Sequence, residues 1–207
     1  MSQVNVINNA GKDINITVNG NSDKIDIVID LVKDFKLSRN LQPGDTFKDT
    51  DGDEYILLYY SPNGDAAILR KESLKEMKFS ETNNNYDGSN IDKYLCDTYL
   101  PELERKFGKE NIVEHDVDLL SLDGEDDYGV IKRKVSLLTF DEYRRNKKTI
   151  KKYIKNWFWL CTPDSTPSGY GSGHICYVGS DSSVRCRWYD CVWGVRPFVI
   201  LKDSAFE

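Results

Sequence analysis

The sequence predicts an α+β domain, in which two helices pack on short antiparallel sheets, with a small N-terminal β-hairpin as an extension. Three observations predict this fold class. Apolar and polar residues alternate near the N-terminus, turn dipeptides separate short apolar runs between residues 41 and 72, and two later segments place apolar residues at helical spacing.

Length and composition fit a single medium domain and exclude several classes of protein. The chain has 207 residues, of which we assign 41–201 to the domain. The net charge of −6 argues against a nucleic-acid partner, because such partners are bound largely by neutralising phosphates. The polar start shows no signal peptide, and no apolar run is long enough to span a bilayer. We therefore expect no membrane insertion, and a location in the cytoplasm or in a phage virion.

Residues 1–36 are expected to form a separate β extension. Two runs in which apolar and polar residues alternate flank the turn sequence NGNSD, which predicts a hairpin. The apolar positions are Ile14, Ile16 and Val18, then Ile25, Ile27 and Ile29. A lone hairpin is only marginally stable in water, so this one must pack on the main domain, on a second copy or on a larger assembly. It is therefore a possible site of homo-oligomer assembly.

Residues 41–72 are predicted to form short strands separated by turns. The turn dipeptides are Pro43–Gly44, Asp51–Gly52 and Asn63–Gly64. The acidic run around the second turn consists of Asp49, Asp51, Asp53 and Glu54. It resembles a calcium loop, but its glycine stands one place too early and the closing glutamate is missing. We therefore expect a solvated hairpin tip rather than a metal site.

Two segments show the signals of helices. The first spans residues 89–107, where Ser89 or Asn90 can cap the N-terminus and Pro101 is expected to kink or restart the helix. The second spans residues 139–154, where Thr139 and Glu142 form the capping-box pattern Thr-x-x-Glu. Each helix is expected to pack on a sheet.

The composition changes between residues 156 and 201. Charged residues are sparse there, and all four tryptophans and four of the five cysteines lie in this stretch. Tyr, Trp and Arg set among Ser and Gly are typical of binding surfaces, since rigid aromatics and small adaptable residues make good contacts. We expect Trp157, Phe158 and Trp159 to be buried in a β-core.

Surface recognition is expected for part of the same stretch, because arginines with few acids nearby are costly to bury. The residues concerned are Arg185, Arg187, Trp188, Tyr189 and Trp193. The ending GVRPFVIL is predicted to be a closing strand. Arg196 is expected to be structural there, paired with a carboxylate or with backbone carbonyls.

The five cysteines do not fit a zinc site. Their count is odd, and the last four include no Cys-x-x-Cys pair. Without an export signal, reduced thiols are expected. We therefore expect neither a metal nor another cofactor.

Several segments carry a resemblance to a known family: WFWLCTPDS at 157–165, YVGSDSSV at 177–184 and GVRPFVIL at 194–201. They resemble a bacterial and phage family of domains of unknown function, in which a Trp-Trp-Leu-Arg-Ser-Pro segment precedes a Gly-Val-Arg-Pro ending. The stretches NIDKYLCDTYLPELERKF and VSLLTFDEY resemble further parts of that family, so the likeness covers about residues 41–201. The chain departs from the pattern at Cys161, where the family has Arg.

The family is similar to C-type-lectin-like domains, the fold also used by variable proteins of diversity-generating retroelements. In those proteins, adenine-directed mutagenesis randomises codons near the C-terminus, and the scaffold displays the resulting side chains. The resemblance implies framework roles for Trp157, Trp159, Leu160, Pro163, Gly194, Val195, Arg196 and Pro197. It implies a variable ligand-binding region at residues 170–193, in which Trp188 and Trp193 could belong to either class.

The candidate ligand-binding residues lie within that region. They are Tyr170, His174, Cys176, Tyr177, Ser183, Arg185, Cys186, Arg187, Trp188, Tyr189, Cys191 and Trp193. No catalytic and no metal-binding residue is expected among them.

The favoured function is that of a ligand-binding display protein, not an enzyme, whose ligand is a protein or a surface glycan. Affinity would come from a few aromatic and Arg anchors. Two alternatives stay open. A structural virion or tail component would bind other subunits, with the N-terminal hairpin as its assembly module. An enzyme related to the formylglycine-generating group would need a reactive pair such as Cys186 and Cys191 near His174, but no base with an orienting partner is visible.

Overall fold

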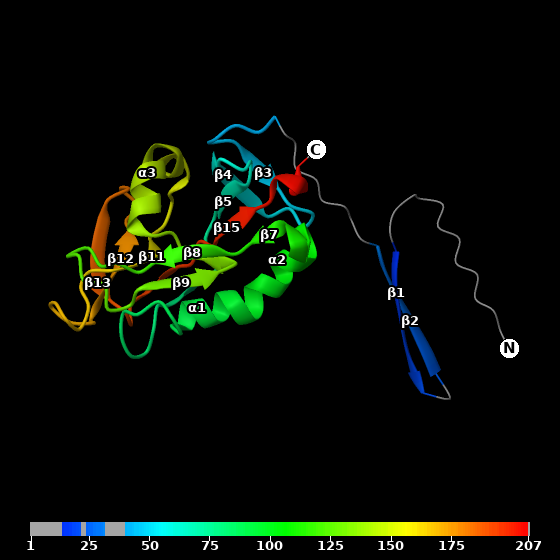
Figure 1. Cartoon of the computed structure of the whole chain (residues 1–207), viewed down its shortest axis with the longest axis horizontal. Helices are drawn as coiled ribbons and strands as arrows, with labels where there is room; N and C mark the ends of the chain where they lie inside the picture. Colours follow the sequence, from blue (N-terminus) through cyan, green and yellow to red (C-terminus); the bar gives the residue numbers. More distant parts are fainter. Residues whose placement is uncertain (1–13, 22–23, 32–39, 207) are drawn as a thin grey trace.

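The computed structural model describes residues 14–21, 24–31 and 40–206. They form an α+β structure in which two helices accompany several antiparallel sheets, as the sequence predicts. Figure 1 shows the two larger sheets next to each other, with the first helix running along one side of the domain. In the described part of the chain, no helix is long and apolar enough to cross a membrane.

The first sheet contains the strands predicted for residues 41–72 and the predicted closing strand. Its order is β10-β15-β5-β4-β3, and β7 pairs with the second half of β15. The strands are β3 (Thr46–Lys48), β4 (Glu54–Tyr60), β5 (Ala66–Arg70), β7 (Ile112–Val113), β10 (Val135–Ser136) and β15 (Phe198–Leu201). The turns at Gly52 and Gly64 require glycine, since φ is +90° and +88° there. The C-terminal strand β15 is inserted between β5 and β10, so the predicted closing strand is an interior strand of the sheet.

The second sheet comes mostly from the stretch of unusual composition. Its order is β13-β12-β11-β14-β6, and only β11 and β14 are parallel within it. The strands are β6 (Glu76–Lys78), β11 (Phe158–Pro163), β12 (His174–Val178), β13 (Val184–Trp188) and β14 (Val192–Gly194). A smaller antiparallel pair consists of β8 (His115–Asp118) and β9 (Val130–Arg133).

Both predicted helices are confirmed. The first is divided into α1 (Asn90–Tyr94), a π-helical turn (Leu95–Tyr99) and α2 (Leu100–Phe107), with Ser89 as its cap. The π turn ends two residues before Pro101, which cannot donate a backbone hydrogen bond, so the expected irregularity falls close to this proline. The second is α3 (Phe140–Ile150), followed by a 3₁₀ turn (Lys151–Tyr153). Further 3₁₀ turns span Lys109–Asn111 and Asp203–Ala205.

The second sheet separates two apolar clusters. Ile175 and Tyr177 of β12 belong to the cluster that contains residues of α1 and α2, whereas Cys176 and Val178 belong to the cluster that contains residues of α3. Alternate residues of a strand point to opposite faces, so β12 contributes to both. All six residues of β11 are buried, which explains why FWLCTP contains no charge.

The predicted N-terminal hairpin is confirmed in its paired part. Strands β1 (Ile14–Asn21) and β2 (Lys24–Leu31) are antiparallel, with Ile16 opposite Ile29. The rest of the predicted extension, residues 1–13, 22–23 and 32–36, lies outside the described residues.

The prediction of a buried Trp157 is wrong, although Phe158 and Trp159 are buried as expected. Trp157 is 42% exposed because it precedes the first residue of β11. Its ring packs 5.4 Å from the ring of Tyr177, and its Nε1 donates to Ser180 Oγ at 3.4 Å. Trp157 therefore covers the margin of the core instead of filling it.

The prediction of a solvated acidic tip is wrong for Asp49. Its side chain is 0% exposed and lies 2.9 Å from Lys106 Nζ, which α2 brings beneath the turn. Tyr55 Oη donates to the same carboxylate at 3.2 Å. Asp51 and Gly52 remain exposed. The turn is therefore anchored to the helix by an ion pair that the local sequence does not reveal.

The structural role predicted for Arg196 is confirmed. The residue is 3% exposed, and its Nε donates to the Arg70 carbonyl oxygen at 3.0 Å. Its guanidinium lies 4.7 Å from the centre of the Phe158 ring, so it packs on an aromatic face.

Candidate ligand-binding pocket

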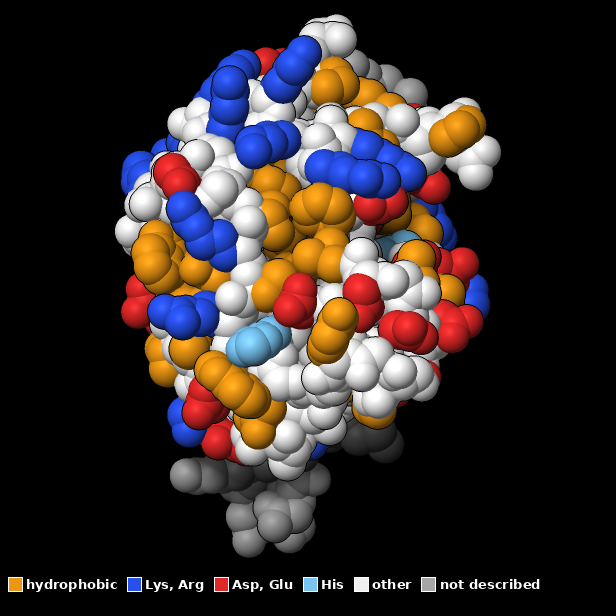
Figure 2. Space-filling model, turned by 90° about the vertical axis from the view of Figure 1, so that its left-hand side faces the viewer, with side chains coloured by type: hydrophobic (Ala, Val, Ile, Leu, Met, Phe, Trp, Pro, Cys, Tyr) orange, Lys and Arg blue, Asp and Glu red, His pale blue; other side chains and the backbone are white. Residues whose placement is uncertain are grey.

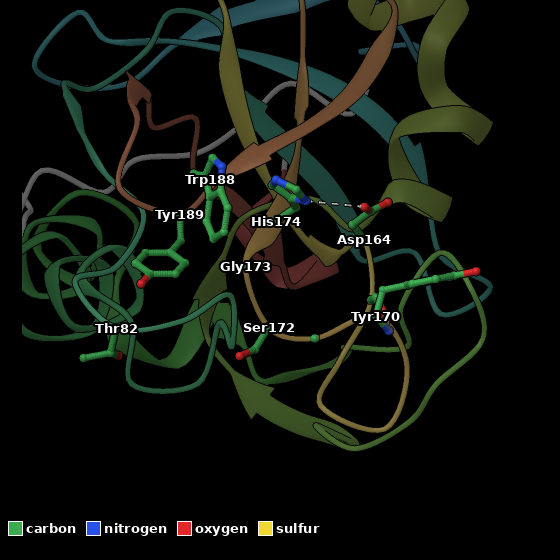
Figure 3. A pocket seen from close by; sticks show the side chains of 10 residues that line it. Thr82, Asp164, Tyr170, Ser172, Gly173, His174, Trp188 and Tyr189 are labelled. Atoms are coloured by element: carbon green, nitrogen blue, oxygen red, sulfur yellow. Dashed lines mark hydrogen bonds and ion pairs between the residues drawn. The ribbon is translucent and has the colours of Figure 1, made fainter.

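An open pocket of about 350 Å³ lies where β12 begins and β13 ends. Figure 3 shows the residues around it, which are Thr82, Asp164, Ser165, Tyr170, Gly171, Ser172, Gly173, His174, Trp188 and Tyr189. Most come from the loop between β11 and β12, whereas Trp188 is the last residue of β13 and Tyr189 follows it. The pocket thus joins segments that precede and follow the same pair of strands.

One wall of the pocket is aromatic. His174 and Trp188 are opposite each other in the β12–β13 register, and their ring centres are 4.7 Å apart. The ring of Tyr189 lies 6.3 Å from that of Trp188, nearly at right angles to it. Trp188 is 54% exposed, so a ligand can reach its ring. Tyr170 is 97% exposed and extends away from the pocket in Figure 3.

Gly173 sets the position of Trp188. A β-carbon at Gly173 would lie 2.6 Å from the indole ring, closer than side-chain atoms approach in proteins. The backbone of the same residue accepts a hydrogen bond from the Tyr189 N–H at 3.2 Å. The absence of a side chain at Gly173 therefore allows the indole to approach the loop backbone closely.

A polar group adjoins the aromatic wall at His174. The Asp164 carboxylate lies 3.9 Å from His174 Nδ1, and both side chains are nearly half exposed, at 46% and 44%. Ser165 Oγ accepts a hydrogen bond from the Tyr170 N–H at 2.6 Å, so this hydroxyl already has a partner within the loop. Within the described residues, no three His, Cys, Asp or Glu side chains are grouped to hold a metal ion.

Asn84 holds the pocket loop in place. It is 0% exposed, and its Nδ2 donates to the carbonyl oxygens of Ser165 and His174 at 2.9 and 2.6 Å. Its N–H donates to the Ser172 carbonyl oxygen at 3.0 Å, and its Oδ1 accepts from Tyr128 Oη at 2.7 Å. These bonds satisfy a buried amide and fix both ends of the loop, so the backbone of the pocket is preorganised.

The structure brings four of the predicted site residues together. Tyr170, His174, Trp188 and Tyr189 all border the pocket, although the Tyr170 side chain extends away from it. Cys176 and Tyr177 are 0% and 4% exposed, so neither can contact a ligand at the surface.

The remaining candidates of β13 and the turn before it lie elsewhere. Adjacent strand residues point to opposite faces, so Arg185 and Arg187 lie on the other face from Trp188. Arg185 pairs with Asp181 at 2.7 Å, and this hydrogen-bonded contact lowers the pKa of the Asp181 carboxyl. Ser183 Oγ also donates to Asp181, at 2.6 Å. These residues therefore form a second surface, apart from the pocket.

Trp193 and the cysteines are also apart from the pocket. The Trp193 ring lies 3.9 Å from that of Tyr177 and packs on the core, so it serves as framework. Cys191 packs against the same apolar cluster, whereas Cys186 packs against the other one. The reactive pair of Cys186 and Cys191 considered above is therefore not assembled.

Sequence reasoning missed the part of the pocket that Thr82 and Asn84 provide. These residues are far from 170–193 along the chain, and only the polar run TNNN at 82–85 could have drawn attention to them. It also missed Asp164, which it placed in the framework segment 157–165 without a role.

Figure 2 shows the end of the molecule that carries α3, β12 and β13. Lys and Arg side chains gather over α3, hydrophobic side chains fill a hollow beneath them, and a mixture of acidic, histidine, hydrophobic and other side chains lies below. No single sign of charge covers this face.

Comparison of the chain with protein-family models, curated proteins and solved structures finds no match. The site must therefore be interpreted from its own geometry and chemistry.

Proposed function

We propose that this chain is a ligand-binding display protein with a C-type-lectin-like fold, and that the pocket between Asp164 and Trp188 binds a protein or a surface glycan. The observation that carries the proposal is an exposed aromatic wall with the Asp164 carboxylate beside it, in a pocket whose loop is held by Asn84. Rigid aromatics supply contact area at low entropic cost, and a few fixed polar groups orient the ligand.

The burial pattern supports the proposed division between scaffold and displayed residues. Most positions that the family resemblance assigns to the framework are buried: Trp159, Leu160, Pro163, Gly194, Val195, Arg196 and Pro197. Tyr170, Arg185, Arg187 and Trp188, which belong to the proposed variable region, are exposed. A retroelement that diversifies 170–193 would thus alter exposed positions such as these while leaving most of the scaffold intact.

Binding of the labelled chain to bacterial cells tests the proposal. Trp188→Ala should weaken binding at least about 30-fold, because an exposed tryptophan anchor contributes roughly 2 kcal/mol or more. Trp157→Ala is the matched control, since that ring is exposed at a similar level but lies outside the pocket. Equal binding of Trp188→Ala and the unaltered chain, or loss of binding only in Trp157→Ala, would contradict the assignment.

Treatment of the cells distinguishes the two ligand classes. Periodate destroys the vicinal diols of glycans, and protease removes surface proteins. Loss of binding after periodate alone indicates a glycan, and loss after protease alone indicates a protein.

A role as a structural virion or tail component is the second candidate, and the N-terminal hairpin favours it. The strands β1 and β2 form a two-stranded sheet of their own, which is marginal in water without a partner. If residues 1–36 drive assembly, deleting them should lower the number of subunits per particle, measured as the mass of the particle in solution divided by the mass of the chain. An unchanged oligomeric state would exclude that role.

A further inference from the structure

Two cysteines meet on the α3 side of the second sheet. Cys176 of β12 and Cys186 of β13 are directly opposite in the antiparallel register, and their Sγ atoms are 3.1 Å apart. Opposite Cα atoms of antiparallel strands are about 4.5–5.5 Å apart, within the range of about 4.4–6.8 Å that disulfides span. The backbone therefore already has the spacing of a disulfide, and only side-chain torsions need to adjust.

The other thiols have different surroundings. Cys161 Sγ donates to the Leu137 carbonyl oxygen and Cys96 Sγ to the Asp92 carboxylate, each at 3.6 Å. Cys191 packs against the opposite apolar cluster. Cys186 is half-buried whereas Cys176 is buried, so Cys186 is the more accessible of the two.

We propose that Cys176 and Cys186 form a redox modification site, which low-molecular-weight disulfides convert to an intramolecular disulfide. Cys186 reacts first, because it is the more accessible of the two. Its thiolate attacks one sulfur of the oxidant and forms a mixed disulfide, and the other half leaves as a thiolate that takes up a proton. Cys176 then loses its proton and attacks the Cys186 sulfur, which releases the second thiol. The two protein thiols give up two electrons, and the oxidant accepts them as it becomes two thiols.

The disulfide would lie directly beside the pocket. The next residue pair on the same face of the two strands is His174 and Trp188, which form the aromatic wall. A disulfide between Cys176 and Cys186 would link β12 to β13 at the residue pair next to the aromatic wall on the same face. Oxidation therefore preorganises the pocket further and slows ligand dissociation. This last step rests on the proposed function, whereas the modification site itself does not.

The first test counts thiols in the full-length protein. The chain is equilibrated with oxidised glutathione, the remaining thiols are blocked with a maleimide under denaturing conditions, and the mass is measured. The five thiols of the reduced chain should fall to three, with no glutathione left on the protein. Five blocked thiols at every ratio of oxidised to reduced glutathione would overturn the proposal.

Serine variants identify the partners. Cys176→Ser should stop at the mixed disulfide of Cys186 with glutathione, and Cys186→Ser should keep its four remaining thiols. Cys191→Ser is the matched control and should still lose two thiols on oxidation. An intramolecular disulfide in either of the first two variants, or its loss in the control, contradicts the pairing. Thermal melting checks that each variant is folded. If Cys176→Ser unfolds, the thiol count of Cys186→Ser tests the pairing instead, because Cys186 is only half-buried.

Cell binding of the reduced and oxidised chain separates this inference from the proposed function. Slower dissociation of the oxidised chain supports the link to the pocket. If the disulfide forms and dissociation is unchanged, the link is overturned while the modification site stands. If neither form binds cells, the proposed function fails and the thiol count still decides whether the site exists.

Discussion

At the scale of single residues, the acidic turn between β3 and β4 depends on one buried cation. Lys106 is 3% exposed at its side chain and lies within ion-pair distance of Asp49, Asp51 and Asp53. Arg70 also pairs with Asp53, and its hydrogen bond is the main cause that lowers the pKa of that carboxyl. Asp49 is the carboxylate most dependent on Lys106, because it is fully buried.

Replacing Lys106 with Met should therefore be strongly destabilising. The substitution keeps the apolar stem but leaves the Asp49 carboxylate without its cation. We expect a loss of about 3 kcal/mol in the free energy of unfolding, at the lower end for a broken buried ion pair, because Asp51 and Asp53 retain contact with water. Urea denaturation measures the change.

Lys132→Met is the matched control for that variant. Lys132 pairs with Asp116 at 3.2 Å, but the two side chains are 67% and 66% exposed. Its loss should change the free energy of unfolding by no more than about 0.5 kcal/mol. Similar losses in both variants would show that burial of the Lys106 network contributes nothing.

At the scale of elements, α3 owes its start to a reciprocal pair of hydrogen bonds. Thr139 Oγ1 accepts from the Glu142 N–H at 3.1 Å, and Glu142 Oε2 accepts from the Thr139 N–H at 2.8 Å. Thr139→Ala removes the hydroxyl acceptor and should cost about 1 kcal/mol of the free energy of unfolding. Thr139→Ser, which keeps the hydroxyl, should stay close to the unaltered chain. A fall in Tm in the alanine variant and not in the serine variant confirms the cap; equal falls contradict it.

This capping box was predictable because all of its atoms belong to four consecutive residues. The same holds for the turns at Asp51–Gly52 and Asn63–Gly64, and for the irregular helix near Pro101. In each case, one or two side chains or their absence restrict the backbone locally. Sequence patterns therefore located both helices, the strands of residues 41–72 and the closing strand.

The pocket was predictable only in part, because its assembly depends on contacts between distant segments. The composition of residues 170–193 indicated recognition, but it could not show which side chains share a face. The one-residue alternation of β13 places Arg187 and Trp188 on opposite faces, and the register of β12 with β13 brings Cys176 to Cys186. Asn84, which supports the pocket loop from another part of the chain, gave no local signal of that role.

At the scale of the whole molecule, His115 connects the small β8–β9 sheet to the first sheet. Its Nε2 lies 2.9 Å from Ser136 Oγ, and its ring packs edge-on against Phe198 at 5.2 Å. Ser136 and Phe198 are themselves opposite residues of β10 and β15. The imidazole is therefore enclosed between elements that are distant in sequence, and this burial lowers its pKa to about 4.

The buried imidazole should make the fold sensitive to mild acid. In the unfolded chain His115 takes up a proton near its ordinary pKa of 6.5, whereas in the folded chain it resists until about 4. The unfolded state thus binds more protons between these values, and stability falls as the pH falls through them. Between about pH 7.5 and about pH 5 the loss should be roughly 2 kcal/mol.

His115→Gln tests this assignment, because glutamine can still hydrogen-bond to Ser136 but does not titrate. Urea midpoints at the two pH values should differ clearly in the unaltered chain and much less in this variant. His174→Gln is the control, since that histidine is 44% exposed and makes no comparable contact with the core; its midpoints should shift like those of the unaltered chain. An undiminished shift in His115→Gln would place the acid sensitivity elsewhere. A shift that disappears shows that a single neutral histidine ties the stability of the whole domain to pH.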